Sequence, residues 1–333
     1  MRMSTAKLGS ASSHSTIVHS DSPLATPKHH PRQAVWSDSG EAILPSITKV
    51  VNVASVTHRS PFRYPGGKTW LVPAVRQWLA SLAAPPSELI EPFAGGGIVG
   101  LTVAFDGLAP RVTLVELDVD VASVWKVMLN GQATWLADQI ATFDIERENV
   151  LRLLQSHPSS LRERAFLTLL KNRVNRGGIL AHGAGISKFG ENGNGVASRW
   201  YPNTLRERIL GIHAMRDHLQ FIEGDGICVI SANASRPDVA FFIDPPYTAA
   251  GKRAGLRLYR HASLDHEALF RAAESIRGPL LMTYDDCPEV EEMAHRHGFQ
   301  TARIPMKNTH HAVMNELLIG RDLSWADERR LRL

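Results

Sequence analysis

The stretch VAFFIDPPY, residues 239–247, joins five apolar residues to a turn that contains two prolines. An apolar run of this length, rich in branched and aromatic residues, predicts a buried strand. Two consecutive prolines can neither continue a strand nor begin a regular helix, so the chain leaves the sheet here in a stiff, extended turn. The turn therefore places a carboxylate and an aromatic ring at the carboxyl edge of a sheet, where open α/β folds bind their ligands.

The residues of this turn suit a planar base that carries an exocyclic amino group. Tyr247 can stack on the face of the base, while Asp244 and the carbonyl oxygen of Pro245 can accept hydrogen bonds from the amino group. We therefore predict that Asp244, Pro245, Pro246 and Tyr247 form a turn that binds such a base, and the family resemblance stated below implies that this turn is catalytic. A strand-ending turn without any chemistry has the same composition, so the neighbouring motifs decide between the two interpretations.

A glycine-rich loop follows an apolar strand in LIEPFAGGGIVG, residues 89–100. Glycines let the backbone approach a ligand closely, and the helix that begins after them offers free amide donors. The next predicted strand, VTLVELD at 112–118, carries Glu116 about 20 residues after the loop, the spacing of an acid that binds ribose hydroxyls. A solvated charge at a strand end is the alternative for Glu116. Together, the loop and the acid predict a site for a ribose-containing cofactor.

A third motif, FRYPGGK at 62–68, precedes both. In this order, the three motifs resemble the Dam-type, adenine-specific DNA methyltransferases, in which an aromatic-x-Gly-Gly-Lys segment and a Glu-Pro-Phe-x-Gly-x-Gly loop cradle S-adenosylmethionine. The resemblance covers about Pro61 to Trp325 and implies S-adenosylmethionine as the cofactor. The residues that it assigns to the cofactor are Tyr64, Gly66, Gly67, Lys68, Glu91, Pro92, Phe93, Gly95, Gly97, Glu116 and Asp225. The alternatives are a surface lysine at a helix start for Lys68 and a plain turn acid for Asp225.

By this resemblance, the protein transfers a methyl group to the exocyclic amino group of adenine in double-stranded DNA, with the target base flipped out of the duplex. In the family, aspartate rather than serine at the first position of the catalytic turn favours adenine over cytosine. The alternatives are a methyltransferase that acts on RNA or on a protein amide, whose versions of the turn normally begin with asparagine, and a catalytically idle nucleic-acid-binding relative. A cognate restriction endonuclease is a candidate partner, and restriction-modification is a candidate role.

Charge is distributed unevenly along the chain. The net charge is +4, but residues 147–216 carry twelve Lys and Arg against four Glu, a net of +8, and residues 1–60 carry a net of +3. A basic segment within an otherwise acidic body is typical of a surface that contacts phosphates, although several of its arginines are expected to face solvent on helices. Within this segment, which also holds a counterpart of the family's Asn-Arg segment, the predicted DNA-binding residues are Arg173, Asn175, Arg176, Lys188 and Arg199.

Bulk properties narrow the class of protein. A chain of 333 residues with 44% hydrophobic content can bury a substantial core, which predicts one large domain with an insertion. No apolar run reaches the ~18–20 residues that span a bilayer, and no signal-peptide core is seen near the start, so we predict a cytoplasmic protein without membrane contact. Cys228 and Cys287 are predicted to be inert buried thiols, and we expect no structural metal because the histidines are scattered.

The alternation of strand and helix patterns predicts an α/β fold with a doubly wound, mostly parallel seven-stranded sheet of the Rossmann-like methyltransferase type. The closing strand is expected to be antiparallel, as the resemblance implies. Strands are expected near 88–92, 112–117, 219–223, 239–243, 279–284, 299–305 and 312–320.

About ninety residues separate the helix near 119–130 from the next strand, too many for a crossover, and they predict an inserted, mainly helical target-recognition subdomain. Its helices are expected at about 144–155, 160–173 and 203–217, and those before it at about 68–84, 97–106 and 119–130. The predicted domains are a disordered tail at 1–58, the methyltransferase domain at 59–134 and 218–325, and the insertion at 135–217. For the β-rich segment 47–56, an edge strand and a flexible segment remain the two interpretations.

Overall fold

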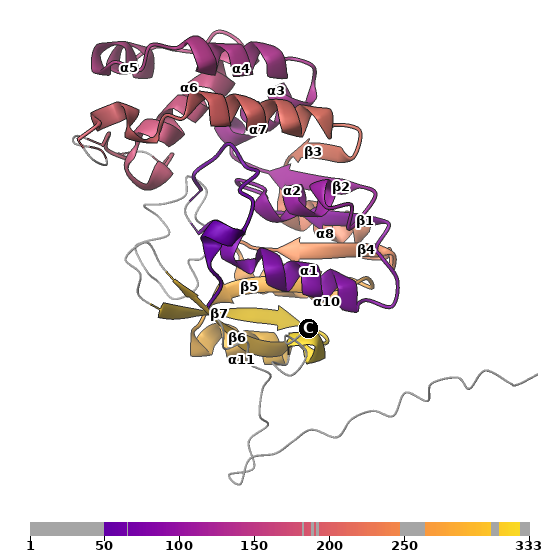
Figure 1. Cartoon of the computed structure of the whole chain (residues 1–333). Helices are drawn as coiled ribbons and strands as arrows, with labels where there is room; N and C mark the ends of the chain where they lie inside the picture. Colours follow the sequence, from indigo (N-terminus) through magenta and orange to yellow (C-terminus); the bar gives the residue numbers. More distant parts are fainter. Residues whose placement is uncertain are drawn as a thin grey trace, which may run out of the picture. The chain divides into compact units, whose positions relative to one another are not determined.

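The computed structural model describes residues 50–64, 66–181, 183–187, 190, 193–246, 264–307 and 313–326, all of which belong to the unit Leu44–Leu333. At its centre lies a seven-stranded sheet in the order β3-β2-β1-β4-β5-β7-β6 (Figure 1). β1 to β5 pair in parallel, and β7 is antiparallel to both of its neighbours. The strands are β1 (Glu88–Glu91), β2 (Val112–Glu116), β3 (Leu219–Glu223), β4 (Val239–Ile243), β5 (Leu280–Asp285), β6 (Gln300–Lys307) and β7 (Val313–Gly320).

This strand order is that of the Rossmann-like methyltransferase fold, so the predicted fold class is confirmed. The direction of winding reverses between β1 and β4, which pair directly in the middle of the sheet. In open α/β sheets, a crevice forms at such a reversal, outside the carboxyl ends of the strands, and ligands bind there. The fold therefore predicts a binding site at the ends of β1 and β4, where the glycine-rich loop and the proline turn begin.

Two helical layers cover the sheet, with α1, α2 and α3 in one part of the core and α8, α10 and α11 in another. Every residue of β4 is buried. Its side chains alternate between the two layers: Phe242 packs with the first and Phe241 with the second. A strand that is apolar on both faces is covered on both sides, and this fixes the turn that follows it. The helices outside the insertion are α1 (Val72–Ser81), α2 (Ile98–Phe105), α3 (Val119–Leu129), α8 (Gly226–Asn233), α10 (His266–Ser275) and α11 (Pro288–Arg296).

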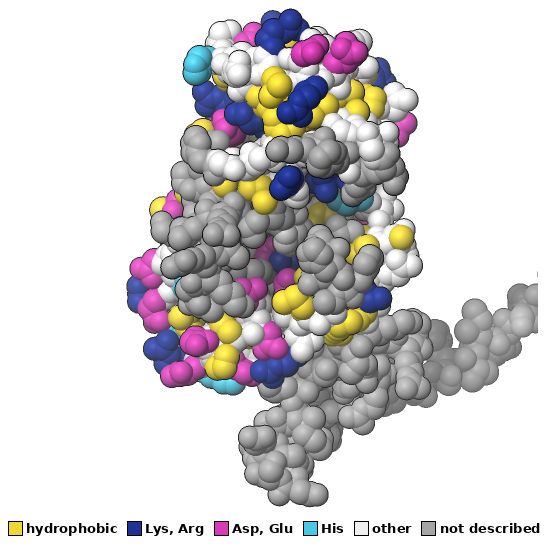
Figure 2. All heavy atoms as spheres, turned by 90° about the vertical axis from the view of Figure 1, so that its left-hand side faces the viewer, with side chains coloured by type: hydrophobic (Ala, Val, Ile, Leu, Met, Phe, Trp, Pro, Cys, Tyr) yellow, Lys and Arg dark blue, Asp and Glu magenta, His cyan; other side chains and the backbone are white. Residues whose placement is uncertain are grey.

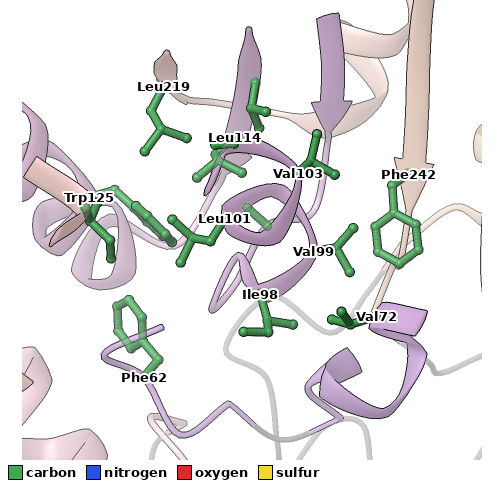
Figure 3. Packing of buried hydrophobic residues seen from close by; sticks show 14 of the residues in the cluster. Phe62, Val72, Ile98, Val99, Leu101, Val103, Leu114, Trp125, Leu219 and Phe242 are labelled. Atoms are coloured by element: carbon green, nitrogen blue, oxygen red, sulfur yellow. The ribbon is translucent and has the colours of Figure 1, made fainter. Parts of the chain in front are cut away.

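α2, which follows the glycine-rich loop, lies in the middle of the first layer. All of its residues from Ile98 to Ala104 are buried, as expected for a helix that is apolar all round. In Figure 3, Leu101 points towards Trp125 of α3, and Val99 points towards Phe242 of β4. This packing holds the start of α2, and with it the loop, in a fixed position over the sheet.

The chain between α3 and β3 forms a mainly helical insertion, which occupies the upper part of Figure 1. Phe143 packs edge-on against Phe166 and Trp200, with ring centroids 5.4 and 5.9 Å apart. Apolar residues of the insertion join the same core as α3. The elements of the insertion are α4 (Ala133–Thr142), α5 (Arg147–Leu154), α6 (Leu161–Val174) and α7 (Pro202–Ala214), with 3-10 turns at Arg176–Gly178 and Gly195–Arg199.

The sequence prediction missed α4. Its buried residues, Ala133, Leu136, Ala137 and Ile140, recur at the spacing of an amphipathic helix. Two of them are alanines, which give only a weak apolar signal. The helix is stabilised mainly by its packing in the insertion, as is usual for short helices.

Part of the predicted tail belongs to the folded domain. In the described residues 50–58, Val56 is buried, and Val53–Ser55 form a 3-10 turn. The edge-strand interpretation of 47–56 does not hold for the part of it that the structure describes, which contains no strand. The rest of the predicted tail, residues 1–49, lies outside the described residues.

The prediction of two buried thiols is wrong for Cys228, which is exposed, while Cys287 is buried. Cys228 lies on α8, a helix that fully buries only Gly226 and Ile230. Residues four apart lie on one face of a helix, so Cys228, midway between them, points away from the core. In the part of the chain that the structure describes, no helix is long and apolar enough to cross a membrane.

Candidate active site

A cavity of about 1130 Å³ opens at the carboxyl ends of β1, β2 and β4. All of the residues predicted to bind the cofactor, from Tyr64 to Asp225, line it, together with Asp244, Pro245 and Pro246. Tyr247 lies outside the described residues. Figure 2 looks onto this side of the molecule and shows acidic side chains in a recess between its upper and lower parts. Three motifs that are far apart in the sequence therefore meet at one site.

The glycine-rich loop has a backbone and surroundings that require glycine. Gly95 and Gly97 both have positive φ angles, +48° and +61°, a region that L-residues with a side chain rarely adopt. A Cβ atom on Gly95 would lie 2.6 Å from the ring of Tyr64, and one on Gly97 would lie 2.7 Å from the indole of Trp125. The first motif thus packs on the second: Tyr64 lies against the loop from one side and Trp125 from the other.

Glu116 connects the loop to the end of β2. Its carboxylate accepts hydrogen bonds from the backbone N–H of Gly95, at 3.0 Å, and of Asp118, at 2.8 Å. Burial raises the pKa of Glu116 to about 7, although the backbone hydrogen bonds oppose this shift. Glu116 is half-buried and bound to two backbone N–H groups, so it is not a freely solvated strand-end charge. A carboxylate held at this position can accept hydrogen bonds from a diol, and its contact with a ribose stays a prediction.

Glu91, at the end of β1, is more deeply buried. Its Oε2 accepts a hydrogen bond of 2.7 Å from the backbone N–H of Gly100, and burial raises its pKa to about 8. A Cβ atom on Gly100 would lie 2.6 Å from this carboxylate. Glu91 therefore stabilises the first turn of α2, in addition to lining the cavity.

Asp225 begins α8 at the wall of the cavity. Its Oδ1 accepts hydrogen bonds from the backbone N–H groups of Ile227 and Cys228, at 2.7 and 3.1 Å, so it caps the helix. A Cβ atom on the next residue, Gly226, would lie 2.4 Å from the carbonyl oxygen of Pro92. The structure thus gives Asp225 the turn role that the sequence left open, and it also places the residue beside the cavity.

Lys68 links the first motif to the proline turn. Its Nζ lies 3.0 Å from Asp244 Oδ1 and 3.3 Å from Glu316 Oε2, and it donates a hydrogen bond to the carbonyl oxygen of Gly66 at 2.9 Å. The residue is only 2% exposed, which excludes a surface lysine at a helix start. Thr283 Oγ1 donates a second hydrogen bond to Asp244 Oδ1, at 2.9 Å. Two donors therefore orient the carboxylate of Asp244.

The sequence analysis did not identify Glu316 or Thr283. Glu316 lies on β7 and Thr283 on the neighbouring strand β5, where Glu316 pairs with Asp285 and Thr283 with Leu318. Burial raises the pKa of Glu316 to about 7, against the opposing effect of Lys68. One signal was present in the sequence: a glutamate stands at the start of the apolar run of β7, where a buried charge needs a partner.

The insertion holds one wall of the cavity through side chains of α6 and α7. Asn172 accepts a hydrogen bond from the backbone N–H of Arg63 at 2.8 Å and donates to the carbonyl oxygens of Arg63 and Gly178, at 2.9 and 2.7 Å. Arg173 donates to the carbonyl oxygen of Pro61, and Arg208 donates to that of Ser60 at 3.1 Å. The segment 60–63, which leads into the first motif, is therefore fixed by the insertion.

The predicted DNA-binding residues have different surroundings. Arg173 and Asn175 are buried, and Asn175 donates to the carbonyl oxygen of Ile179 at 2.8 Å, so both stabilise the protein's own backbone. Arg176 is exposed and Arg199 is half-buried, whereas Lys188 lies outside the described residues. Contact of these residues with nucleic acid stays a prediction.

The same wall carries a cluster of cations that the sequence analysis only partly identified. Burial, followed by the charges of Arg208 and Arg63, lowers the pKa of Arg173 to about 9. Burial and two of these arginines lower the pKa of His58 to about 4. In the described part of the chain, no carboxylate lies within ion-pair distance of Arg63, Arg173 or Arg208. Its lowered pKa leaves His58 uncharged at neutral pH, but Arg63 also lines the cavity, and with the nearby Arg173 and Arg208 it would attract a polyanion.

Comparison with known proteins gives only distant structural similarities. No family model matches the chain, and no curated protein matches it. The rRNA methyltransferase AviRa of Streptomyces viridochromogenes is similar over 78% of this chain and 86% of its own, with 14% identity and a TM-score of 0.37. The tRNA methyltransferase TrmK of Bacillus subtilis is similar over 74% of this chain and 64% of its own, with 8% identity and a TM-score of 0.33. The glycopeptide N-methyltransferase MtfA is similar over 75% of this chain and 88% of its own, with 12% identity and a TM-score of 0.31. At such identities and TM-scores, neither membership in the Dam-type family nor a substrate follows. Among the described residues, no group of three or more His, Cys, Asp or Glu side chains could hold a metal ion.

Proposed function

We propose that this protein transfers a methyl group from S-adenosylmethionine to the exocyclic amino group of a nucleobase in nucleic acid, with adenine in DNA as the first candidate. The main support is the single cavity that joins the glycine-rich loop, the acid after β2 and the Asp244-Pro245-Pro246 turn. A cofactor pocket next to a carboxylate and a free carbonyl oxygen is the arrangement that methylation of an amino group requires.

The residues of the cavity fit S-adenosylmethionine. The volume of about 1130 Å³ accommodates a nucleoside-sized cofactor beside a base. Gly95 and Gly226 stand where a Cβ atom would meet neighbouring atoms at 2.6 and 2.4 Å, so the cavity is bounded by closely packed backbone. Glu116 would accept hydrogen bonds from the ribose hydroxyls, and the loop before α2 would cover the cofactor.

S-adenosylmethionine supplies a methyl group on a sulfonium ion, and both electrons of the broken bond stay with the sulfur. The task of the protein is then to position an amino nitrogen in line and to keep its lone pair available. Asp244 and the carbonyl oxygen of Pro245 would accept hydrogen bonds from the two amino protons and draw the lone pair away from the ring. The nitrogen becomes positively charged on methylation, and Asp244 is placed to take up the proton that it then releases.

RNA is the second candidate substrate. Two of the solved structures with the same fold are named as rRNA and tRNA methyltransferases, and none of the three compared above is named for DNA. The cationic wall formed by Arg63, Arg173 and Arg208 suits the phosphates of either polymer. Adenine in DNA is favoured by the aspartate at the first position of the turn, through the family resemblance.

Incorporation of tritiated methyl groups tests the proposal. The protein would be incubated with labelled S-adenosylmethionine and, in parallel, with unmethylated DNAs, with unmodified tRNA and rRNA, and with a protein extract. We expect label in the amino group of adenine in DNA, and none with Asp244→Ala. Asp238→Ala, at the other end of β4 and 55% exposed, is the matched control and should retain activity.

Each outcome of this experiment has a definite meaning. Label in RNA alone, or in protein alone, would replace the DNA assignment by that alternative. Label that persists in Asp244→Ala would refute the role of the turn. Binding of nucleic acid without transfer to any substrate would indicate the catalytically idle relative.

A further inference from the structure

Glu316 places a buried carboxylate beside the proposed catalytic turn. It lies on β7, which inserts between β5 and β6, and it is 7% exposed. Across the sheet it faces Asp285 of β5 and Ile304 of β6. A buried carboxylate costs free energy unless a partner compensates for its lost hydration. Lys68 Nζ, at 3.3 Å from Oε2, provides that compensation.

The ammonium group of Lys68 is shared. It lies 3.0 Å from Asp244 and 3.3 Å from Glu316, and the lysine is 2% exposed, so little water weakens either attraction. The strength of each ion pair therefore depends on the charge of the other carboxylate. If Glu316 loses its charge, Asp244 is the one carboxylate of this pair that still attracts the ammonium group of Lys68 electrostatically.

We propose that Glu316 is a positioning residue that sets, through Lys68, how strongly Asp244 accepts a hydrogen bond from the amino group of the substrate. The inference rests on the proposed function. With Glu316 ionised, Lys68 is divided between two carboxylates, and Asp244 remains a strong acceptor. With Glu316 neutral, Lys68 forms a stronger ion pair with Asp244 and competes with the amino group of the substrate for the lone pairs of the Asp244 carboxylate.

The surroundings of Glu316 place its change of charge near neutral pH. Among the described residues, the charged groups that act on it are Lys68, Asp244 and Asp285. Burial raises the pKa of Glu316 to about 7, the two aspartates act in the same direction, and Lys68 opposes them. Methyl transfer should therefore become faster as the pH rises through this region.

Glu316→Gln tests the proposal, because glutamine has the same shape without the charge. In single-turnover reactions with saturating S-adenosylmethionine, we expect the variant to be about tenfold slower than the unaltered protein above pH 8, as for a charged hydrogen bond replaced by a neutral one. We also expect the rise near pH 7 to disappear. Glu88→Gln is the matched control: Glu88 is buried and ion-paired with Arg236 at 2.8 Å, at the amino end of β1. Glu88→Gln should retain the increase in the rate of methyl transfer near pH 7.

Glu116 also has a pKa near 7, but it faces the predicted cofactor site, so its titration should change the affinity for S-adenosylmethionine rather than the rate at saturation. A second measurement needs neither cofactor nor substrate. In protein labelled with ¹³C at the glutamate carboxyl groups, NMR should show two resonances that titrate near pH 7, and the one that is missing in Glu316→Gln belongs to Glu316, the other to Glu116. In Asp285→Asn, which removes a neighbouring negative charge, both the Glu316 resonance and the kinetic rise should move to lower pH.

An unchanged rate and an unchanged rise in Glu316→Gln would overturn the inference while leaving the proposed function intact. If Glu316→Gln does not fold, Asp285→Asn provides the test. An increase in rate that stays at the same pH in Asp285→Asn as in the unaltered protein would likewise overturn the inference. Absence of methyl transfer by the unaltered protein to every substrate would instead refute the proposed function, and this inference with it.

Discussion

Replacement of Gly97 by alanine tests whether the loop before α2 is held as tightly as the site requires. Gly97 has a φ of +61°, and a Cβ atom there would lie 2.7 Å from Trp125, which is completely buried. The left-handed backbone costs about 1–2 kcal/mol for any residue with a Cβ. Trp125 also donates a hydrogen bond of 3.0 Å to the carbonyl oxygen of Gly95, so it cannot move without loss. Forcing extra volume into such a core costs about 1–3 kcal/mol more.

Gly107 provides the matched control, since its φ is +66° and a Cβ atom there would have no neighbouring atom within 4 Å. Gly107→Ala should therefore lose only the backbone contribution, and Gly97→Ala should be less stable than the control by about 1–3 kcal/mol. Urea unfolding gives both free energies, and calorimetry with S-adenosylmethionine should show weaker binding for Gly97→Ala alone. Equal free energies of unfolding for the two variants would refute the reasoning.

Three further predictions concern other parts of the site. Asn172 is completely buried, and Asn172→Ala removes its three hydrogen bonds to the cavity wall, so the variant should have a free energy of unfolding lower by about 2–4 kcal/mol. Asn149→Ala, at a half-buried site whose hydrogen bonds are exposed to solvent, should lower it by less than about 1 kcal/mol in the same urea titration. Similar losses in the two variants would contradict the wall's dependence on Asn172. Arg63→Gln should weaken the binding of nucleic acid and make the affinity less dependent on salt, while Arg271→Gln, on the exposed face of α10, should change neither the affinity nor its salt dependence. Fluorescence anisotropy at several salt concentrations measures both quantities. An unchanged salt dependence in Arg63→Gln would exclude contact of Arg63 with phosphates. Burial raises the pKa of Glu91 from 4.5 to about 8, so its contribution to stability is present below pH 4.5 and is lost as the pH rises through about 8. Between pH 5 and 8, Glu91→Gln should therefore lose less stability than the unaltered protein, as measured by chemical unfolding. Equal losses in the two proteins would show that Glu91 is not the source of the pH dependence of stability.

The central strands β1, β4 and β5 could be predicted closely because they are buried on both faces. The run 239–243, for example, contains only apolar residues and is followed by two prolines at 245 and 246, so the local sequence determines both that it is a strand and where the strand ends. The residues assigned to the cofactor could be predicted to lie close together for a related reason: the loops after parallel strands meet at the same edge of the sheet. The cavity brings them together as that rule requires.

The remaining features of the site depend on contacts between distant segments. Glu316 reaches Lys68 only because β7 inserts next to β5, and no local pattern indicates that partnership. Arg173 looked like a surface cation in a basic segment, but α6 packs it against the chain at Pro61, where it binds a carbonyl oxygen. Asn172 was not predicted, because a single asparagine in a helix does not indicate a structural role until the backbone segment that it binds is known.

The central claim is that the cavity binds S-adenosylmethionine with its methyl group directed at the Asp244 turn. A crystal structure with S-adenosylhomocysteine, the demethylated product, tests this most directly. The account predicts the ribose hydroxyls of the ligand at Glu116 and its sulfur facing Asp244 and Pro245. A ligand bound elsewhere, or one in the cavity with its sulfur directed away from this turn, would contradict it.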